Sequence, residues 1–235
     1  MGLQLALPLP LQGSDAAEDL VPDPSNAEAL AWLEAPPEAW PLRRLALHGP
    51  EGVGKTHMLQ AASRRFGWRR LEGPGLTMDA ALADAPGTAL DRADAAPEQA
   101  LFHLINHAAQ TGAPLLLAAR MAPARWPTIL PDLASRLRAT TAVEIAGPGE
   151  GLLAALLAKH LADRQLRVEA GVQAYLLSRL PRHAAAIAQA VAALDAASLA
   201  GATPVTRALA RQILALDDRF ETSSQTPSPP AGGLG

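Results

Sequence analysis

The sequence predicts an α/β fold, in which a parallel sheet flanked by helices is followed by a small helical domain. Three observations indicate this. Between about Leu20 and Ala146, short apolar runs typical of buried strands alternate with helical stretches. The segment Gly147-Pro148-Gly149 then interrupts the pattern. Beyond it only helical patterns occur, up to about Leu216. We therefore expect an α/β domain over residues 20–146 and a helical domain over 147–216.

The two ends of the chain differ from these domains. Residues 1–19 form an arm containing Leu, Gln and Pro but no helical period. From about Asp217 the chain turns to Ser, Pro and Gly, a composition typical of disorder. We expect a flexible N-terminal arm and a disordered tail over 217–235.

Composition narrows the class of protein. The 235 residues suit one or two domains, and 49% hydrophobic content supplies a sizeable core. A net charge of −3 gives no global reason to expect a nucleic-acid or membrane surface. The absence of cysteine excludes disulfides and thiolate metal sites. No signal-peptide pattern is visible, and no apolar run approaches the ~20 residues of a membrane helix. We expect a cytoplasmic protein with no membrane partner.

The elements follow in order along the chain. Ser25 precedes Glu28 by three residues, which predicts a capped start for a helix over Ala27–Leu33. A strand is expected over Leu42–His48, and a helix from Lys55 to Ala62. Two further buried strands are expected over Pro114–Ala119 and Ala142–Ala146, and the last four helices over Gly151–Arg164, Ala170–Leu180, His183–Ala200 and Thr206–Leu216.

The strongest chemical motif lies between the first strand and the helix that follows it. Residues Gly49 to Thr56 read GPEGVGKT, a complete Walker A pattern. Its glycines, Gly49, Gly52 and Gly54, let the backbone N–H groups turn toward phosphate oxygens. Lys55 supplies a charge for the outer phosphates, and the Thr56 hydroxyl is a ligand for Mg²⁺. We expect the whole loop, with Val53 and the next residue His57, to bind a nucleotide at the start of a helix.

Three further segments carry a resemblance to a known family. The run GKTHMLQAA from Gly54 to Ala62, the run PDLASRL from Pro131 to Leu137, and Ser25-Asn26 resemble the DnaA-related AAA+ ATPases. The resemblance covers roughly Leu20 to Leu216. It implies a P-loop AAA+ domain with a helical lid, ADP or ATP with Mg²⁺ as cofactor, and Arg136 as an arginine finger. We expect no C-terminal helix-turn-helix domain of the kind that binds DNA in the initiator.

The arm extends this resemblance to the Hda family of regulatory inactivators. The segment QLALPL, with Gln4, Leu5, Leu7, Pro8 and Leu9, resembles the peptide by which bacterial proteins bind the sliding clamp. An extended peptide of this kind places Leu and Pro side chains in an apolar pocket, while the glutamine reaches a polar site. The alternative is a leucine-rich arm packed on the body of the protein. The resemblance implies two partners, the sliding clamp (the β subunit of DNA polymerase III) and DnaA, with DNA reached mainly through the clamp, and a possible homo-oligomer.

Catalytic positions of the family are altered in this chain. Asp91 is the best candidate for the Walker B acid that holds Mg²⁺ through water, and Asp84 competes with it. The next position, usually an acid that orients water, is Arg92. Arg120 follows the strand where a polar sensor is expected. The sensor arginine of the lid aligns with Ala185, with Arg182 at an unsuitable spacing.

These features predict a protein that binds nucleotide, hydrolyses it weakly or not at all, and promotes hydrolysis of ATP on DnaA, which prevents re-initiation. One alternative is an independent AAA+ ATPase, such as a replication loader or a helicase-associated motor. Another is an initiator-like DNA-binding protein.

Overall fold

The computed structural model describes residues 20–201 and 203–216. The predicted clamp peptide and the predicted tail lie outside the described residues. Over the described residues the chain divides into two compact units, one holding 20–50 and 54–145, the other holding 51–53, 146–201 and 203–216. Each unit has its own core, and each is described separately below.

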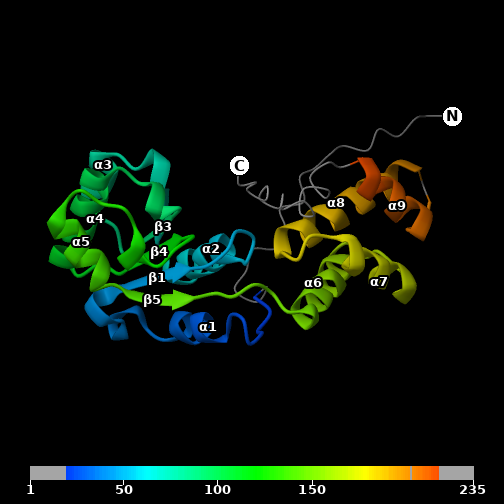
Figure 1. The fold of residues 1–235 in the computed structure, drawn as a ribbon, viewed down its shortest axis with the longest axis horizontal. Helices are drawn as coiled ribbons and strands as arrows, with labels where there is room; N and C mark the ends of the chain where they lie inside the picture. Colours follow the sequence, from blue (N-terminus) through cyan, green and yellow to red (C-terminus); the bar gives the residue numbers. More distant parts are fainter. Residues whose placement is uncertain (1–19, 202, 217–235) are drawn as a thin grey trace, which may run out of the picture. The chain divides into compact units, whose positions relative to one another are not determined.

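The first unit is built on a parallel five-stranded sheet with the order β2-β3-β4-β1-β5 (Figure 1). Every pair of neighbouring strands is parallel, so all five carboxyl ends lie at one edge of the sheet. The three central strands, β1, β3 and β4, are buried along most of their length, as expected for strands covered on both faces, whereas the edge strands β2 and β5 are partly exposed. They are β1 (Arg44–His48), β2 (Arg69–Glu72), β3 (Thr88–Asp91), β4 (Leu115–Ala119) and β5 (Thr141–Glu144).

Helices cover both faces of this sheet (Figure 1). One core cluster joins inward-facing strand residues such as Ala46 and Leu117 to α3, α4 and α5. The alternate strand residues, such as Leu45 and Leu116, are equally buried and point to the opposite face. There α2 contacts β3 and β4, and α1 contacts β5. The helices are α1 (Ala27–Glu34), α2 (Lys55–Phe66), α3 (Met78–Leu82), α4 (Glu98–Thr111) and α5 (Pro131–Arg138).

Short 3₁₀ turns complete the connections, at Pro37–Ala39, Pro41–Arg43, Gly73–Gly75, Ala93–Ala95 and Pro123–Arg125. The second of them shortens the predicted first strand, which begins at Arg44 rather than Leu42. Leu42 and Arg43 both adopt positive φ angles, of 54° and 50°, which extended strand residues do not adopt.

The predicted capping of α1 by Ser25 is wrong. The N-cap residue is Asn26, and no side chain caps the helix. The Ser25 hydroxyl donates instead to the Asp23 carboxylate at 2.6 Å. Asn26 organises the preceding turn: its amide oxygen accepts from the Asp23 N–H and its amide nitrogen donates to the Val21 carbonyl, both at 2.9 Å. A local turn therefore satisfies the side chains that the capping pattern assigned to the helix.

The second unit is helical over its described residues and has one core of its own. Its buried apolar side chains come from all the helices, including Leu157, Leu176, Ile187 and Ala210. The Arg207 guanidinium also lies over the Tyr175 ring, 4.9 Å from its centroid. The helices are α6 (Glu150–Asp163), α7 (Ala170–Arg179), α8 (Ala184–Gly201) and α9 (Arg207–Leu216).

One helix in the described part of the chain is long and apolar enough to cross a membrane by length and composition alone. It is α8, with a mean hydropathy of 1.5. From the sequence we expect no apolar run close to the length of a membrane helix, and that expectation misses this helix. Ile187, Ala190, Val191 and Leu194 of α8 are buried in the core of the second unit, and 28% of the apolar window is buried.

Candidate nucleotide-binding site

The glycine loop leaves the carboxyl end of β1 and enters α2 directly. Gly49 has a φ of 150°, and a Cβ atom there would clash with the Ile145 carbonyl oxygen. Glycine is therefore required at this position, because the end of the fifth strand passes so close. Gly54, at φ 102°, precedes Lys55, the first residue of α2. Gly52 and Val53 lie in the turn between these points, and His57 is in the first turn of α2.

Lys55 and Thr56 start α2 with their side chains on the loop side. The Lys55 ammonium donates to the Gly49 and Pro50 carbonyls, at 2.8 Å and 2.6 Å, and so lies across the loop. The Thr56 hydroxyl donates to the Asp91 carboxylate at 2.5 Å. The other Asp91 oxygen accepts the Arg92 N–H at 2.8 Å. The fold thus brings together residues 35 apart in sequence, a hydroxyl and a carboxylate, beside the loop.

His48 is the last residue of β1, immediately before the loop, and its surroundings shift the pKa of its side chain. Burial lowers the pKa of its imidazole, and the positive charges of Arg125 and Lys55 lower it further, while Glu144 opposes them. The neutral imidazole is therefore favoured beside the loop.

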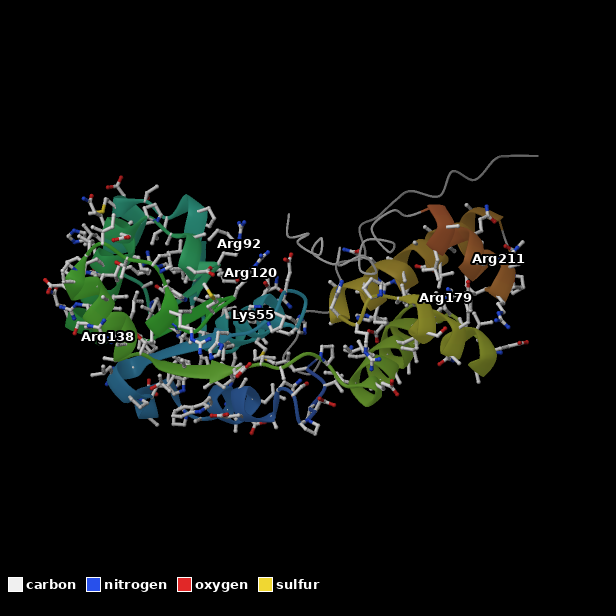
Figure 2. The ribbon with its side chains drawn as sticks, viewed as in Figure 1. Lys55, Arg92, Arg120, Arg138, Arg179 and Arg211 are labelled. Atoms are coloured by element: carbon white, nitrogen blue, oxygen red, sulfur yellow. The ribbon has the colours of Figure 1, made fainter. Side chains whose placement is uncertain are left out.

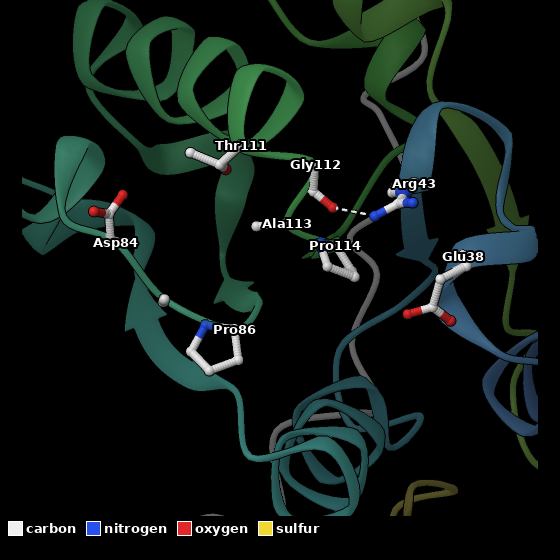
Figure 3. Close-up of a pocket in the computed structure, with 9 residues that line it drawn as sticks. Glu38, Arg43, Asp84, Pro86, Thr111, Gly112, Ala113 and Pro114 are labelled. Carbon is white, nitrogen blue, oxygen red and sulfur yellow. Dashed lines mark hydrogen bonds between the residues drawn. The ribbon is translucent and has the colours of Figure 1, made fainter.

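Asp84 lies at the other edge of the sheet, because it precedes β3 rather than following it. Its side chain is 90% exposed and contacts His107 Nε2 at 3.0 Å. Figure 3 shows Asp84 lining an open pocket at the amino ends of the strands. There the Arg43 guanidinium donates to the Gly112 carbonyl at 2.6 Å. The length of the sheet's strands therefore separates Asp84 from the loop, whereas Asp91, at the carboxyl end of β3, lies beside it.

The positions expected to carry catalytic acids and sensors hold arginines. Arg92 follows β3 in a left-handed conformation, and its guanidinium pairs with Glu72 at 3.0 Å. Arg120 follows β4, whose last residue, Ala119, is in register with His48. The Asp94 carboxylate accepts the Arg120 backbone N–H at 3.3 Å. Figure 2 shows Lys55, Arg92 and Arg120 at the same edge of the first unit.

In the second unit, Ala185 lies exposed in the first turn of α8. Arg182, in the turn before that helix, pairs with Glu150 at 3.1 Å, and both side chains are exposed. His183 Nδ1 accepts the Ala186 N–H at 3.1 Å and so fixes the start of α8.

Arg136 lies far from this chain's own loop. It is near the end of α5, and its carbonyl accepts a hydrogen bond from Arg44 at the amino end of β1. The loop begins at the carboxyl end of the same strand, roughly 13 Å away at ~3.3 Å per residue. Figure 2 shows Arg138, two residues along the same helix, on the opposite side of the first unit from Lys55. Arg136 therefore lies at the amino edge of the sheet, away from this chain's own loop.

Two residues that the sequence expectations missed support this helix. Arg44 is buried at the start of β1. Glu98, the first residue of α4, accepts hydrogen bonds from the N–H groups of Ile129 and Leu130, at 3.0 Å and 3.2 Å, just before α5. The Ile129 N–H is the main cause that lowers the pKa of Glu98. Nothing in the local pattern identifies either residue, because their partners are 92 and about 30 residues away.

The donor set suits a nucleotide with its metal ion. Backbone N–H groups of a tight loop, a lysine and a helix start fit phosphate. Mg²⁺ is commonly held by one or two carboxylates together with substrate phosphates. Asp91 supplies one carboxylate, and the Thr56 hydroxyl lies beside it. Among the described residues no group of three or more His, Asp or Glu side chains forms a metal cluster, so the phosphates and water would complete the shell.

Comparison with known proteins relates the helical unit to a family and the whole chain to a fold. Residues 152–214, which include most of the helical unit, match the profile of the lid domain of Hda. Domain III of the replication initiation protein DnaA of Thermotoga maritima superposes with a TM-score of 0.76, at 16% identity, over 88% of this chain and 98% of that chain. The chain is an AAA+ protein related to Hda and DnaA.

Two other solved structures are similar to this chain in fold. DnaA of Aquifex aeolicus, bound to AMPPCP, has a TM-score of 0.66 at 17% identity; the match covers 79% of this chain and 66% of that chain. The Holliday junction branch migration motor RuvB of Thermotoga maritima has a TM-score of 0.66 at 14% identity, over 88% of this chain and 74% of that chain. Compared by sequence with curated proteins, the chain has no significant match.

Proposed function

We propose that this AAA+ protein is a nucleotide-binding regulator of bacterial chromosome replication. It binds the sliding clamp through the peptide from Gln4 to Leu9, and it promotes hydrolysis of the ATP held by DnaA. Hydrolysis on the initiator then prevents re-initiation. The protein acts in the cytoplasm and reaches DNA mainly through the clamp.

Its own loop holds ADP or ATP in this proposal. The residues assigned to the nucleotide are Gly49, Gly52, Val53, Gly54, Lys55, Thr56 and His57, and those assigned to Mg²⁺ are Thr56 and Asp91. The Thr56–Asp91 hydrogen bond of 2.5 Å supports the metal assignment, because it sets both ligands beside the loop. Likeness to DnaA bound to AMPPCP, an analogue of ATP, supports an adenine nucleotide.

The observation that carries the regulatory role is the position of Arg136 at the sheet edge opposite the loop. A guanidinium is planar, always charged and able to grip phosphate oxygens in two places. Placed at a neighbour's terminal phosphate, such a group accelerates phosphoryl transfer by roughly 10³–10⁵. Arg92, which pairs with Glu72, also supports hydrolysis on the partner rather than on this chain. It stands where the family has the acid that orients water, so this chain lacks that acid.

The test is phosphate release from ATP-bound DnaA on clamp-loaded DNA. We expect the unaltered protein to stimulate release and Arg136→Ala to remove stimulation while folding, clamp binding and nucleotide binding persist. Arg138→Ala is the matched control, because it removes an exposed arginine from the same helix. Arg136→Lys should rescue poorly because lysine lacks the fork. Full stimulation by Arg136→Ala would contradict the mechanism.

A second candidate is an independent AAA+ ATPase that acts as a loader or helicase-associated motor. The Thr56–Asp91 pair favours it, as does the structural likeness to the RuvB motor. ATP turnover by the isolated protein separates the two candidates, because only the motor needs rapid hydrolysis of its own.

A further inference from the structure

A buried arginine lies beneath the helix that carries Arg136. Arg44 is the first residue of β1 and is 5% exposed. Because side chains alternate along a strand, it points to the same face as Ala46, which belongs to the core under α4 and α5. Its Nη2 donates to the Arg136 carbonyl at 3.3 Å. The Thr140 hydroxyl donates to that carbonyl at 2.9 Å. The last turn of α5 is thereby tied to the sheet.

The guanidinium groups of Arg44 and Arg136 lie close together, and neither charge neutralises the other. Arg136 is half-buried, with its Cζ 5.6 Å from the centroid of the Phe102 ring. The Nε atoms of Arg44 and Arg136 are both buried without a hydrogen-bond partner. The pKa of Arg44 is lowered, first by burial and then by the positive charge of Arg136. The two cations are thus close enough to repel each other.

Within the described residues no carboxylate pairs with either arginine, which is unusual for buried charge. Removing a cation from water costs several kcal/mol unless an opposite charge compensates, so proteins rarely bury an unpaired arginine. An adjacent Asp or Glu would stabilise this pair, but it would also neutralise the charge of Arg136 and hold it inside the chain. The arrangement instead leaves the two positive charges of Arg44 and Arg136 together at the amino edge of the sheet, where they would attract an external anion.

We propose that Arg44 is a positioning residue for Arg136: it fixes the end of α5 and, by its charge, directs the Arg136 guanidinium toward the terminal phosphate of a nucleoside triphosphate held by a second AAA+ chain. This inference rests on the proposed function of Arg136. At 5% exposure Arg44 does not reach that phosphate itself and acts through Arg136. The competing interpretation is a purely structural cap, since a positive charge at a helix C-terminus is stabilising in any protein.

The two interpretations differ in what Arg44→Met does to stability. Because an uncompensated buried charge costs stability, replacing it by an apolar side chain of similar length should be neutral or stabilising. We expect the melting temperature of the Arg44→Met full-length protein to stay within about 2 °C of the unaltered protein or to rise. We expect its maximal stimulation of ATP hydrolysis on DnaA to fall about tenfold, because misplaced catalytic groups lose rate steeply. The protein concentration for half-maximal stimulation should change little, because Arg44 does not contact the partner.

Arg44→Lys and Arg138→Met complete the experiment. Arg44→Lys restores the charge and a donor for the Arg136 carbonyl, and it should recover at least half of the lost stimulation. Arg138→Met removes one charge from α5, the helix that carries Arg136, and this variant should stimulate like the unaltered protein. A melting temperature that falls together with activity, or no rescue by lysine, would assign Arg44 a structural role and overturn the inference.

The unaltered protein and Arg136→Ala, measured in the same assay, separate this inference from the proposed function. If both stimulate equally, the role of Arg136 is wrong and the role of Arg44 falls with it. If Arg136→Ala is inactive but Arg44→Met keeps full stimulation, only the inference about Arg44 is overturned.

Discussion

Replacing Asp91 by asparagine should remove the effect of Mg²⁺ on nucleotide binding, whereas the same change at Asp84 should not. Both residues satisfy the sequence pattern for the metal-holding acid. Only Asp91 follows its strand, is 6% exposed and accepts the Thr56 hydroxyl beside the loop. Asp84 is 90% exposed and lies at the opposite edge, against His107.

The magnitudes follow from these contacts. The Asp91 carboxylate accepts two hydrogen bonds, from Thr56 and from the Arg92 N–H. Bonds to a charged group contribute about 1.5–3 kcal/mol each, and asparagine retains part of both, so we expect a loss of ~1–2 kcal/mol without ligand. Nucleotide at a hundredfold excess over Kd adds about 2.7 kcal/mol to the unaltered protein. At ~2–4 °C per kcal/mol for a chain of this size, that is a rise of roughly 5–11 °C.

The assay is a thermal melt of each full-length variant with ADP, with and without Mg²⁺. The unaltered protein and Asp84→Asn should gain more from Mg-ADP than from ADP alone. Asp91→Asn should gain equally from both, and Lys55→Ala should gain from neither. An undiminished Mg²⁺ effect in Asp91→Asn, or its loss in Asp84→Asn, would refute the assignment of Asp91.

Three further outcomes can be measured. Alanine in place of Gln4, Leu7 and Leu9 should weaken binding to purified sliding clamp with little change in melting temperature; unfolding would show that the arm is core packing. The isolated protein should hydrolyse ATP more slowly than ~1 s⁻¹, because Arg92 replaces the acid that orients water, and faster turnover would restore the motor candidate. Glu98, whose pKa is lowered chiefly by a backbone N–H, stabilises the fold above its ordinary pKa of 4.5 and loses that contribution as pH falls through the lowered value. Glu98→Gln should therefore lower the melting temperature more at about pH 7 than at acidic pH, and equal losses at both would contradict this origin.

Much of the fold could be predicted from local pattern. The alternation of apolar runs and helices gave a parallel α/β sheet with a helical domain after the Gly147–Gly149 break, because periodicity and glycine are read within a few residues. The AAA+ relationship to Hda and DnaA followed from short runs such as that around Lys55, and the lid match confirms it. Element ends were less accurate. Ser25 failed as a cap because Asp23, two residues earlier, binds its hydroxyl instead.

The predicted chemistry of the loop follows from the sequence alone, since a glycine-rich turn with Lys55 and Thr56 is a local arrangement of neighbouring residues. Which acid lies beside that loop, and where Arg136 lies, depend on the folded arrangement of the whole domain. Strand order and register place Asp91 at the carboxyl edge, Asp84 at the amino edge, and the buried Arg44 beneath Arg136. These relations join residues tens of positions apart. They are set by the packing of the whole sheet against its helices, which no short segment encodes.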